Sequence, residues 1–293
     1  MARILNGKDV AAAITQSAQK EVDELKAKGI SPTLAILRVG EREDGLSYER
    51  GALKRAATCG IEIKQVVLPA KVQQAELEQA VTSLNNDPSV HGILMFRPLP
   101  KHLDQQAAEA LLSPAKDVDG ITMGSLAGVF ANSGTGFAPC TAAACMEILS
   151  YYGIDCTGKN AAVIGRSLVV GRPVAMMLMH ANATPTICHT RTADAPSITR
   201  EADIVIVAAG RMETIGAEYF SPGQTVIDVG IDWNNEKGKL CGDVKFDEVE
   251  PIVDAITPVP GGVGAVTTSV LMKHVVQAAK LEAMFAEFLT HRQ

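Results

Sequence analysis

Residues 160–173, NAAVIGRSLVVGRP, are the stretch that decides the fold of this 293-residue chain. The first part predicts a short buried strand at 161–164, after which Gly165 lets the backbone turn tightly into a helix. A helix that begins there directs unpaired N–H groups and its positive dipole end at a phosphate. The only glycines are Gly165 and Gly171, so the segment departs from the usual G-x-G-x-x-G. On these residues alone, a nucleotide site and an ordinary turn of an α/β domain fit equally.

The next segment distinguishes the two interpretations. A second predicted strand, 185–188, is followed by HTRT, and Thr190 lies 25 residues after Gly165, near where a dinucleotide-binding domain places the acid that holds the ribose 2′-hydroxyl. No acid occurs there. Thr190 and Arg191, with Arg166 in the first turn, are suited to a 2′-phosphate, which predicts NADP rather than NAD. A solvated arginine at a strand end is the simple alternative for Arg191.

The rest of the second half continues the same alternation. Residues 202–209 (ADIVIVAA) and 224–230 (QTVIDVG) are near-continuous apolar runs, typical of strands buried on both faces of a parallel sheet. Together with the two strands before them, they give β-α-β-α-β spacing. We therefore predict a Rossmann-like, doubly wound parallel sheet for this half of the chain.

The first half predicts a separate α/β unit, which ends near a polar linker at residues 113–120. The expected strands are 33–39, 61–68 and 92–96, and the expected helices are 8–28, 46–58, 74–85 and 103–112. After the linker we expect a glycine-bearing loop at 124–136 and helices at 141–152 and 267–288. The fold class is therefore α/β, with two domains.

Composition and charge exclude several functional classes. The chain is 47% hydrophobic and 20% charged, and its net charge of −6 gives no basic field for nucleic acid. No charged run suggests a membrane surface, no apolar run has the length of a membrane span, and the N terminus lacks the apolar core of a signal peptide. We expect a cytoplasmic protein with a small polar substrate. The six cysteines contain no C-x-x-C pair, so neither a metal site nor a disulfide framework is predicted.

Three further segments suggest a binding site, and each has a simpler interpretation. Residues 117–120 (DVDG) place two carboxylates between the domains, where a cleft is expected, although aspartates also stabilise turns through local hydrogen bonds. Residues 257–264 (TPVPGGVG) form either a rigid backbone wall that a ligand can approach closely or a tight connection into a helix. Tyr48, near the carboxyl end of the first strand, offers a phenol or packs against its neighbours.

Together these motifs resemble the methylenetetrahydrofolate dehydrogenase/methenyltetrahydrofolate cyclohydrolase family. They occur in the family's order and cover nearly the whole chain: LRVG, SY, PAKDVDG, PCT, VIGRS-x3-GRP, CH-x2-T and TPVPGGVG. The resemblance implies two α/β domains that flank a cleft, a homodimer, and NADP laid along the second domain. It also implies that residues 1–138 with the C-terminal helix 268–293 form the folate-binding catalytic domain, and residues 139–267 the NADP-binding domain.

The resemblance also assigns candidate site residues. The cofactor-binding residues that it implies are Gly165, Arg166, Ser167, Thr190 and Ile231, with Arg166 as the 2′-phosphate contact. The folate-binding residues that it implies are Tyr48, Asp119, Pro260, Gly261, Gly262 and Val263, with Tyr48 and Asp119 as the catalytic residues. Asp119 is expected to hold the pterin ring, since a carboxylate can accept the two adjacent donors of a 2-amino-4-oxopyrimidine edge.

Two residues depart from the family pattern. The family has a lysine four residues after the tyrosine and a glutamine in the strand before P-L-P, where this chain has Ala52 and Phe96. In the family this pair is associated mainly with hydrolysis of the methenyl intermediate, a step that needs proton transfer from a residue with a tuned pKa. Hydride transfer depends mainly on positioning. The sequence therefore predicts an NADP-dependent 5,10-methylenetetrahydrofolate dehydrogenase with weak or absent cyclohydrolase activity.

Two alternatives remain at this stage. One is the full bifunctional enzyme, in which Arg55, Arg97 or a group of the substrate replaces the lysine. The other is a dinucleotide-binding sensor that kept the fold and lost the chemistry. The retained Tyr48, Asp119 and PGGVG segment argue against the sensor, because a sensor has no need of a folate site.

Overall fold

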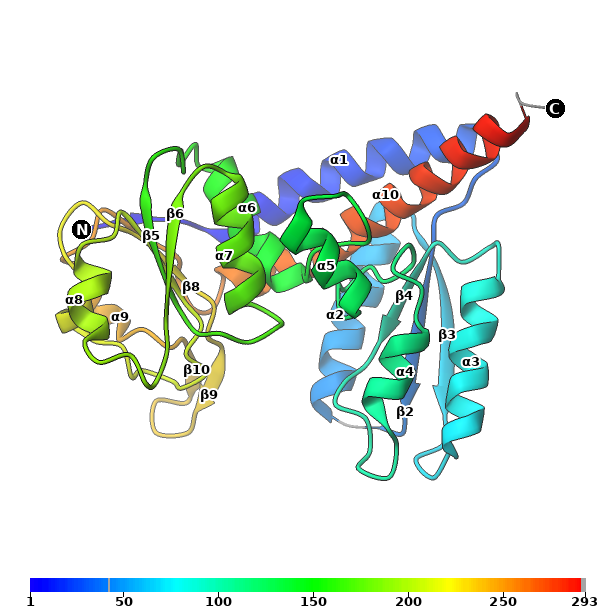
Figure 1. The fold of residues 1–293 in the computed structure, drawn as a ribbon, viewed down its shortest axis with the longest axis horizontal. Helices are drawn as coiled ribbons and strands as arrows, with labels where there is room; N and C mark the ends of the chain where they lie inside the picture. Colours follow the sequence, from blue (N-terminus) through cyan, green and yellow to red (C-terminus); the bar gives the residue numbers. More distant parts are fainter. Residues whose placement is uncertain (42, 291–293) are drawn as a thin grey trace. The chain divides into compact units, whose positions relative to one another are not determined.

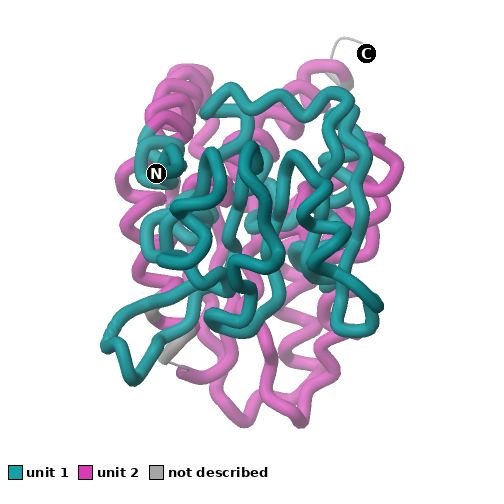
Figure 2. Tube along the Cα trace, turned by 90° about the vertical axis from the view of Figure 1, so that its left-hand side faces the viewer, with its two compact units in different colours: residues 1–12, 139–267 teal, residues 13–138, 268–293 magenta. Residues whose placement is uncertain are grey.

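The computed structural model describes residues 1–41 and 43–290, which divide into two compact units (Figure 2). The six-stranded unit contains residues 1–12 and 139–267, and the three-stranded unit contains residues 13–138 and the chain from residue 268 onward. The expected first domain began at residue 1. The structure places the N-terminal segment differently, because β1 (Arg3–Ile4) pairs in parallel with β11 (Ala255–Ile256) of the six-stranded unit.

A parallel sheet in the order β1-β11-β8-β7-β5-β6 forms the centre of the six-stranded unit (Figure 1). Its strands include β5 (Asn160–Ile164), β6 (Thr184–Cys188), β7 (Ile204–Val207) and β8 (Thr225–Asp228). From β5 onward, the strands of this sheet stand in the order 2-1-3-4-5, a doubly wound arrangement that reverses between β5 and β7. The predicted doubly wound parallel sheet is confirmed.

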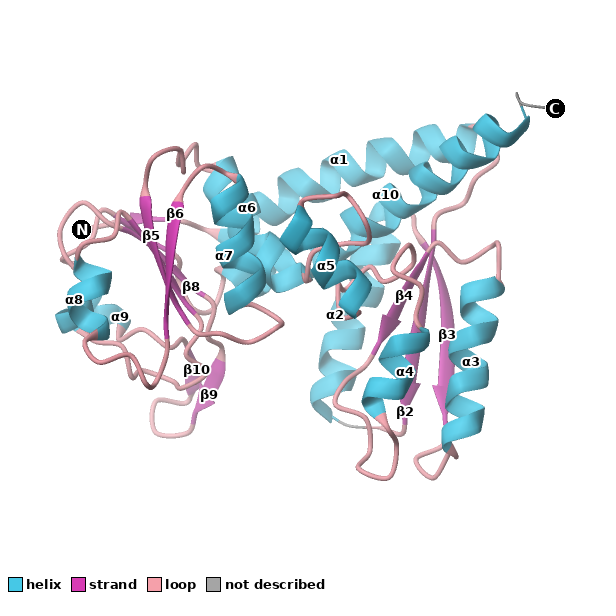
Figure 3. Cartoon of the chain, in the orientation of Figure 1, coloured by secondary structure: helices cyan, strands magenta, loops and turns pink. Residues whose placement is uncertain are grey.

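Helices cover both faces of this sheet (Figure 3). On one face lie α6 (Cys140–Tyr151) and α7 (Gly171–His180), and on the other lie α8 (Ala195–Arg200) and α9 (Phe246–Val249). Val205 and Val207 of β7 pack in a core cluster with Val249 of α9. Ile206, between them, faces the opposite side of the sheet and is equally buried. Burial on both faces explains why the strand sequences are almost wholly apolar. A short antiparallel pair, β9 (Asp232–Asn234) and β10 (Lys239–Cys241), follows β8.

The three-stranded unit has a parallel sheet in the order β3-β2-β4. Its strands are β2 (Thr33–Val39), β3 (Glu62–Leu68) and β4 (Gly92–Met95), and its helices include α2 (Glu43–Cys59), α3 (Gln74–Asn86) and α4 (Gln105–Leu111). α2 lies on one face of the sheet and α3 and α4 on the other (Figure 1). Two long helices, α1 (Gly7–Ala27) and α10 (Val263–Thr290), contribute residues to both units.

One helix lies where the sequence predicted a loop. α5 (Met123–Ala131) begins after Thr122, whose hydroxyl accepts a hydrogen bond from the Ser125 amide at 3.1 Å. It ends at Asn132, which is in the left-handed conformation. The glycines of this segment predicted a loop, but Gly128 serves close packing, because a Cβ there would lie 1.9 Å from the Thr135 carbonyl oxygen.

Two buried aspartates connect the loops at the carboxyl ends of β7 and β8. Asp228 accepts hydrogen bonds from the Gly230, Asp243 and Val244 amides at 3.0–3.1 Å. The Asp243 carboxylate in turn accepts the amides that follow β7, from Gly210 at 2.8 Å and Arg211 at 2.9 Å. Burial raises the pKa of Asp228 to about 7.

This raised pKa predicts a pH-dependent stability. Folded protein keeps the Asp228 proton up to about pH 7, whereas an unfolded chain releases it near pH 4. The contribution of the protonated group to stability is therefore complete below about pH 4 and is lost as the pH rises through about 7. Relative to Asp228→Asn, which cannot titrate, the wild-type protein should lose up to about 1.4 kcal/mol of unfolding free energy per pH unit across this window.

Urea unfolding at pH 4 to 8 measures this difference. Trp233, the only tryptophan, lies in β9 and reports unfolding of the six-stranded unit through its fluorescence. Other carboxylates titrate in both proteins and cancel in the comparison. A difference between the two proteins that stays constant over this range would show that Asp228 does not titrate there.

Candidate functional site

A pocket of about 420 Å³ opens in the six-stranded unit at the carboxyl ends of β5 and β7. This is the point at which the strand order reverses, where open α/β sheets bind their ligands. Its volume is in the range of small-molecule sites. The polar residues that line it include Arg166, Ser167, His189, Thr190, Arg211 and Tyr219.

The two glycines of residues 160–173 allow the tight backbone turn that leads from β5 into α7. Gly165 has φ = +131°, and a Cβ there would lie 2.3 Å from the Ala208 carbonyl oxygen. A Cβ at Gly171 would lie 2.1 Å from the Gly165 carbonyl oxygen. The Ser167 hydroxyl accepts a hydrogen bond at 3.1 Å from the amide of Val170, the residue before α7. Both glycines are therefore required by close backbone approach, in the turn expected to hold a phosphate.

The arginines of the pocket differ from those expected. Arg166 and Thr190 line it, whereas Arg191 is not among the residues that line it. Arg211 lines it too, with its backbone amide fixed by Asp243. Sequence reasoning missed Arg211, although its place directly after a predicted strand and Gly210 is a usable signal.

The proline- and glycine-rich segment and Ile231 lie near each other in the same unit. The Gly7 amide donates a hydrogen bond to the Gly261 carbonyl at 2.8 Å, and a Cβ at Gly7 would lie 2.0 Å from the Gly262 carbonyl oxygen. The backbone of Pro260–Val263 is thus held against the start of α1. The side chain of Ile231 is 50% exposed, and its Cδ1 lies 3.5 Å from where a Cβ of Gly264 would be. Ile231 is near this segment and not among the residues that line the pocket.

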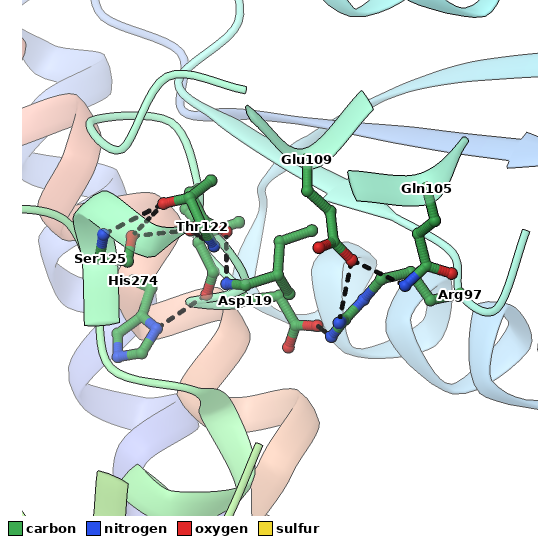
Figure 4. Close-up of polar contacts among 10 residues, drawn as sticks. Arg97, Gln105, Glu109, Asp119, Thr122, Ser125 and His274 are labelled. Carbon is green, nitrogen blue, oxygen red and sulfur yellow. Dashed lines mark hydrogen bonds and ion pairs between the residues drawn. The ribbon is translucent and has the colours of Figure 1, made fainter. Parts of the chain in front are cut away.

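In the three-stranded unit, the two aspartates of residues 117–120 have different roles. Asp117 is fully buried and accepts hydrogen bonds from the Ile121 and Thr122 amides and the Ser125 hydroxyl, at 2.7–3.0 Å. The Asp119 side chain is 24% exposed and lies 3.9 Å from the guanidinium of Arg97 (Figure 4). Asp119 is the more exposed of the two carboxylates, so it is the one placed to meet a ligand.

Arg97 joins Asp119 to a second carboxylate. The guanidinium donates to Glu109 of α4 at 3.3 Å, and the Gln105 side-chain amide donates to the same carboxylate oxygen at 2.8 Å. The Leu99 amide donates to Gln105 at 3.1 Å, which ties the loop after β4 to α4. The result is a partly exposed cluster of two carboxylates and one guanidinium.

Tyr48 packs against an aromatic neighbour. It is half-buried on α2, and its ring meets that of Phe96 edge-on, with centroids 5.9 Å apart. Ala52, one turn further along α2, is fully buried. Of the two arginines that were candidates to replace the family lysine, Arg55 donates to the Thr15 hydroxyl at 3.1 Å, and Arg97 contacts Asp119.

Two other classes of site were searched for. Within residues 1–41 and 43–290, no group of three or more His, Cys, Asp or Glu side chains is arranged to hold a metal ion. No helix of the described chain has the length and apolar character needed to cross a membrane.

The sheet and its pocket define the class: an α/β protein with a doubly wound, dinucleotide-binding unit. More specifically, the chain belongs to the tetrahydrofolate dehydrogenase/cyclohydrolase family. The model of the family's NAD(P)-binding domain matches residues 139–283, and the model of its catalytic domain matches residues 5–119.

Similar proteins extend over almost the whole chain. The bifunctional protein FolD of Carboxydothermus hydrogenoformans is 51% identical over 282 residues, which is 96% of this chain and 98% of that protein. The bifunctional FolD structure from Campylobacter jejuni has a TM-score of 0.92 at 38% identity and covers 96% of this chain and 99% of its own. The Trypanosoma brucei FolD structure, complexed with NADP cofactor and inhibitor, has a TM-score of 0.89 at 38% identity and covers 96% and 98%.

Proposed function

We propose that this protein is an NADP-dependent 5,10-methylenetetrahydrofolate dehydrogenase with weak or absent cyclohydrolase activity. The observation that carries the dehydrogenase assignment is the family membership of a chain that keeps the nucleotide pocket and the partly exposed Asp119. A sensor that lost its chemistry would have no use for the folate site.

The pocket supports NADP as the cofactor. Arg166 and Arg211 line it, and none of the residues described as lining it is acidic. A ribose 2′-phosphate needs cationic donors, whereas a free 2′-hydroxyl is typically held by a carboxylate. We assign the phosphate contacts to Gly165, Arg166 and Ser167, with Thr190 beside them and Ile231 against the cofactor.

Tyr48, Asp119 and Pro260–Val263 form the proposed folate-binding set. Asp119 accepts the 2-amino and N3 donors of the pterin, and Asp117 fixes the turn that carries Asp119. Tyr48 offers an aromatic face beside Phe96. The backbone of Pro260–Val263 is held rigidly enough to act as a wall.

The reaction makes modest demands on these side chains. NADP, held in the six-stranded unit, would supply the acceptor for a hydride from the methylene carbon that bridges N5 and N10 of the folate. A nitrogen lone pair of the substrate expels that hydride, so that a methenyl cation forms without a protein base. The residues must orient the pterin and exclude water. In reactions of this kind, such positioning provides a large part of the lowering of the activation barrier.

Hydrolysis of the methenyl cation has different requirements. It needs an activated water and a group that moves a proton. The methyl of Ala52 and the ring of Phe96, which packs on Tyr48, supply neither. The bifunctional alternative is supported by the names of the relatives and by Arg97, a cation beside Asp119.

We also propose that the protein is a homodimer, as the family resemblance implies, and that it is cytoplasmic, as expected from its sequence. β3 is at the edge of its sheet, and an edge strand offers unpaired backbone groups to another chain.

The first prediction from the proposed function concerns cofactor choice. Arg166→Ala and Arg211→Ala should each raise the KM for NADP about 10- to 150-fold, since a hydrogen bond to a charged group contributes about 1.5–3 kcal/mol. The KM for NAD should change little. Arg191→Ala is the matched control, because Arg191 is an arginine of the same unit that is not among the lining residues. Equal catalytic efficiency of the wild-type protein with both cofactors would contradict the proposal.

The second prediction separates the two aspartates. Asp119→Asn replaces a double acceptor by one acceptor and one donor, so it should raise the KM for methylenetetrahydrofolate and lower turnover while NADP binding is retained. Asp117→Asn should instead lower the melting temperature, because three hydrogen bonds converge on its buried carboxylate. Steady-state kinetics and thermal unfolding of both variants test this, and unchanged folate kinetics in Asp119→Asn would return it to a turn role.

The third prediction concerns cyclohydrolase activity. The wild-type protein should convert methenyl- to formyltetrahydrofolate at a rate close to that of buffer. Ala52→Lys and Phe96→Gln, made singly and together, should restore the step, by up to about 10²- to 10⁴-fold in the double variant, because groups that act as a catalytic unit are non-additive. Loss of methenyltetrahydrofolate absorbance measures the rate, with melting temperatures as a control because both sites are at least partly buried. Rapid hydrolysis by the wild-type protein would establish the bifunctional alternative.

A further inference from the structure

We infer that Arg97 is a substrate-specificity residue, whose guanidinium donates a hydrogen bond to the 4-oxo group of the pterin held by Asp119. The inference rests on the proposed folate site and names the part of the substrate that this chain distinguishes. It therefore predicts selection for a 4-oxo over a 4-amino pterin.

The backbone places Arg97 at the ligand-binding end of its sheet. It is the second residue after β4, and Met95 at the end of that strand pairs with Leu37 of the central β2. The Phe96 amide still bonds to the Leu37 carbonyl at 2.9 Å, so that Arg97 follows the last residue fixed by the sheet. The carboxyl ends of parallel strands are where open α/β sheets bind ligands.

The distance between Arg97 and Asp119 suits a shared ligand. Their closest nitrogen and oxygen are 3.9 Å apart, which is too long for a hydrogen bond and short enough for both groups to reach one planar edge. Both side chains are 24% exposed, and the Arg97 guanidinium points between the two carboxylates in Figure 4. Donation to Glu109 uses one of the five N–H groups of the guanidinium, so donor capacity remains for a ligand.

The surrounding contacts fix the guanidinium before a ligand arrives. Glu109 accepts from Arg97, and Gln105, one turn earlier on α4, donates to the same carboxylate oxygen. Gln105 also accepts from the Leu99 amide, so helix and loop are tied together by one side chain. A donor that is already oriented loses less conformational entropy on binding.

The chemistry of the pterin edge matches this arrangement. A 2-amino-4-oxopyrimidine presents two donors, the 2-amino group and N3–H, followed by one acceptor, the 4-oxo oxygen. A carboxylate pairs with the two donors, and an adjacent guanidinium pairs with the acceptor. A 4-amino group would direct a donor at Arg97 and would leave N3 without a hydrogen. Such a ligand would therefore lose one hydrogen bond to Arg97 and one to Asp119.

Binding measurements without turnover test the inference. Dissociation constants of tetrahydrofolate and its 4-amino-4-deoxy counterpart are measured by calorimetry for the wild-type protein, Arg97→Met and Arg97→Lys. The wild-type protein should prefer the 4-oxo compound at least about a hundred-fold, and Arg97→Met should reduce that ratio by about ten-fold or more. Arg97→Lys keeps the charge but not the planar fork, so its ratio should fall between these two.

The controls separate recognition from structure. Lys64→Met removes another cation of the same unit, paired with Asp87, and should leave the ratio unchanged. If Arg97 only tied α4 to the turn, Arg97→Met would weaken both compounds equally, and an unchanged ratio would overturn the inference. If Arg97→Met does not fold, Arg97→Lys decides in the same way.

The test is independent of the proposed activity. A ratio that falls in the variants of a protein without dehydrogenase activity would support Arg97 and refute the proposed function. A dehydrogenase whose ratio is unaffected by both Arg97 substitutions would refute the inference alone. Failure of the wild-type protein to bind either compound would overturn the inference.

Discussion

The loops that follow β7 and β8 have backbone amides outside the sheet, and two buried aspartates accept hydrogen bonds from these amides. Asp243 holds the amides of Gly210 and Arg211, and Asp228 holds the segment that carries Asp243. These hydrogen bonds fix the backbone of the loop after β7 where it lines the pocket. The position of Arg211 at the pocket therefore depends on Asp243, which accepts its backbone amide, and on Asp228, which holds Asp243 in place.

Apolar periodicity made the sheets predictable, and contacts between distant segments limited the prediction. Strands such as β5 and β7 are buried on both faces, so their sequences are apolar without interruption. β1 has two residues and pairs with a strand at the far end of the chain, which gives it no local signature. The glycines of α5 suggested a loop because the sequence does not show that Gly128 packs against Thr135.

The candidate site, too, could be predicted from the sequence only in part. The turn at Gly165 was predictable, because its φ of +131° needs a glycine and the flanking apolar pattern identifies it. The sequence could not show which of Asp117 and Asp119 is buried. Both lie in one turn, and only the fold determines which side chain faces the interior. Arg211 was missed for a related reason: its amide is fixed by an acid 32 residues away.

The pairing of β1 with β11 bears on synthesis of the protein. Ala255, the partner of Arg3, is synthesised roughly 250 residues after it, a delay on the order of tens of seconds. Until β11 is made, β8 has no neighbour on one side. An exposed strand edge of this kind can pair with other chains. Neither unit is one continuous segment, so a nascent chain must keep residues 1–12 available until β11 emerges.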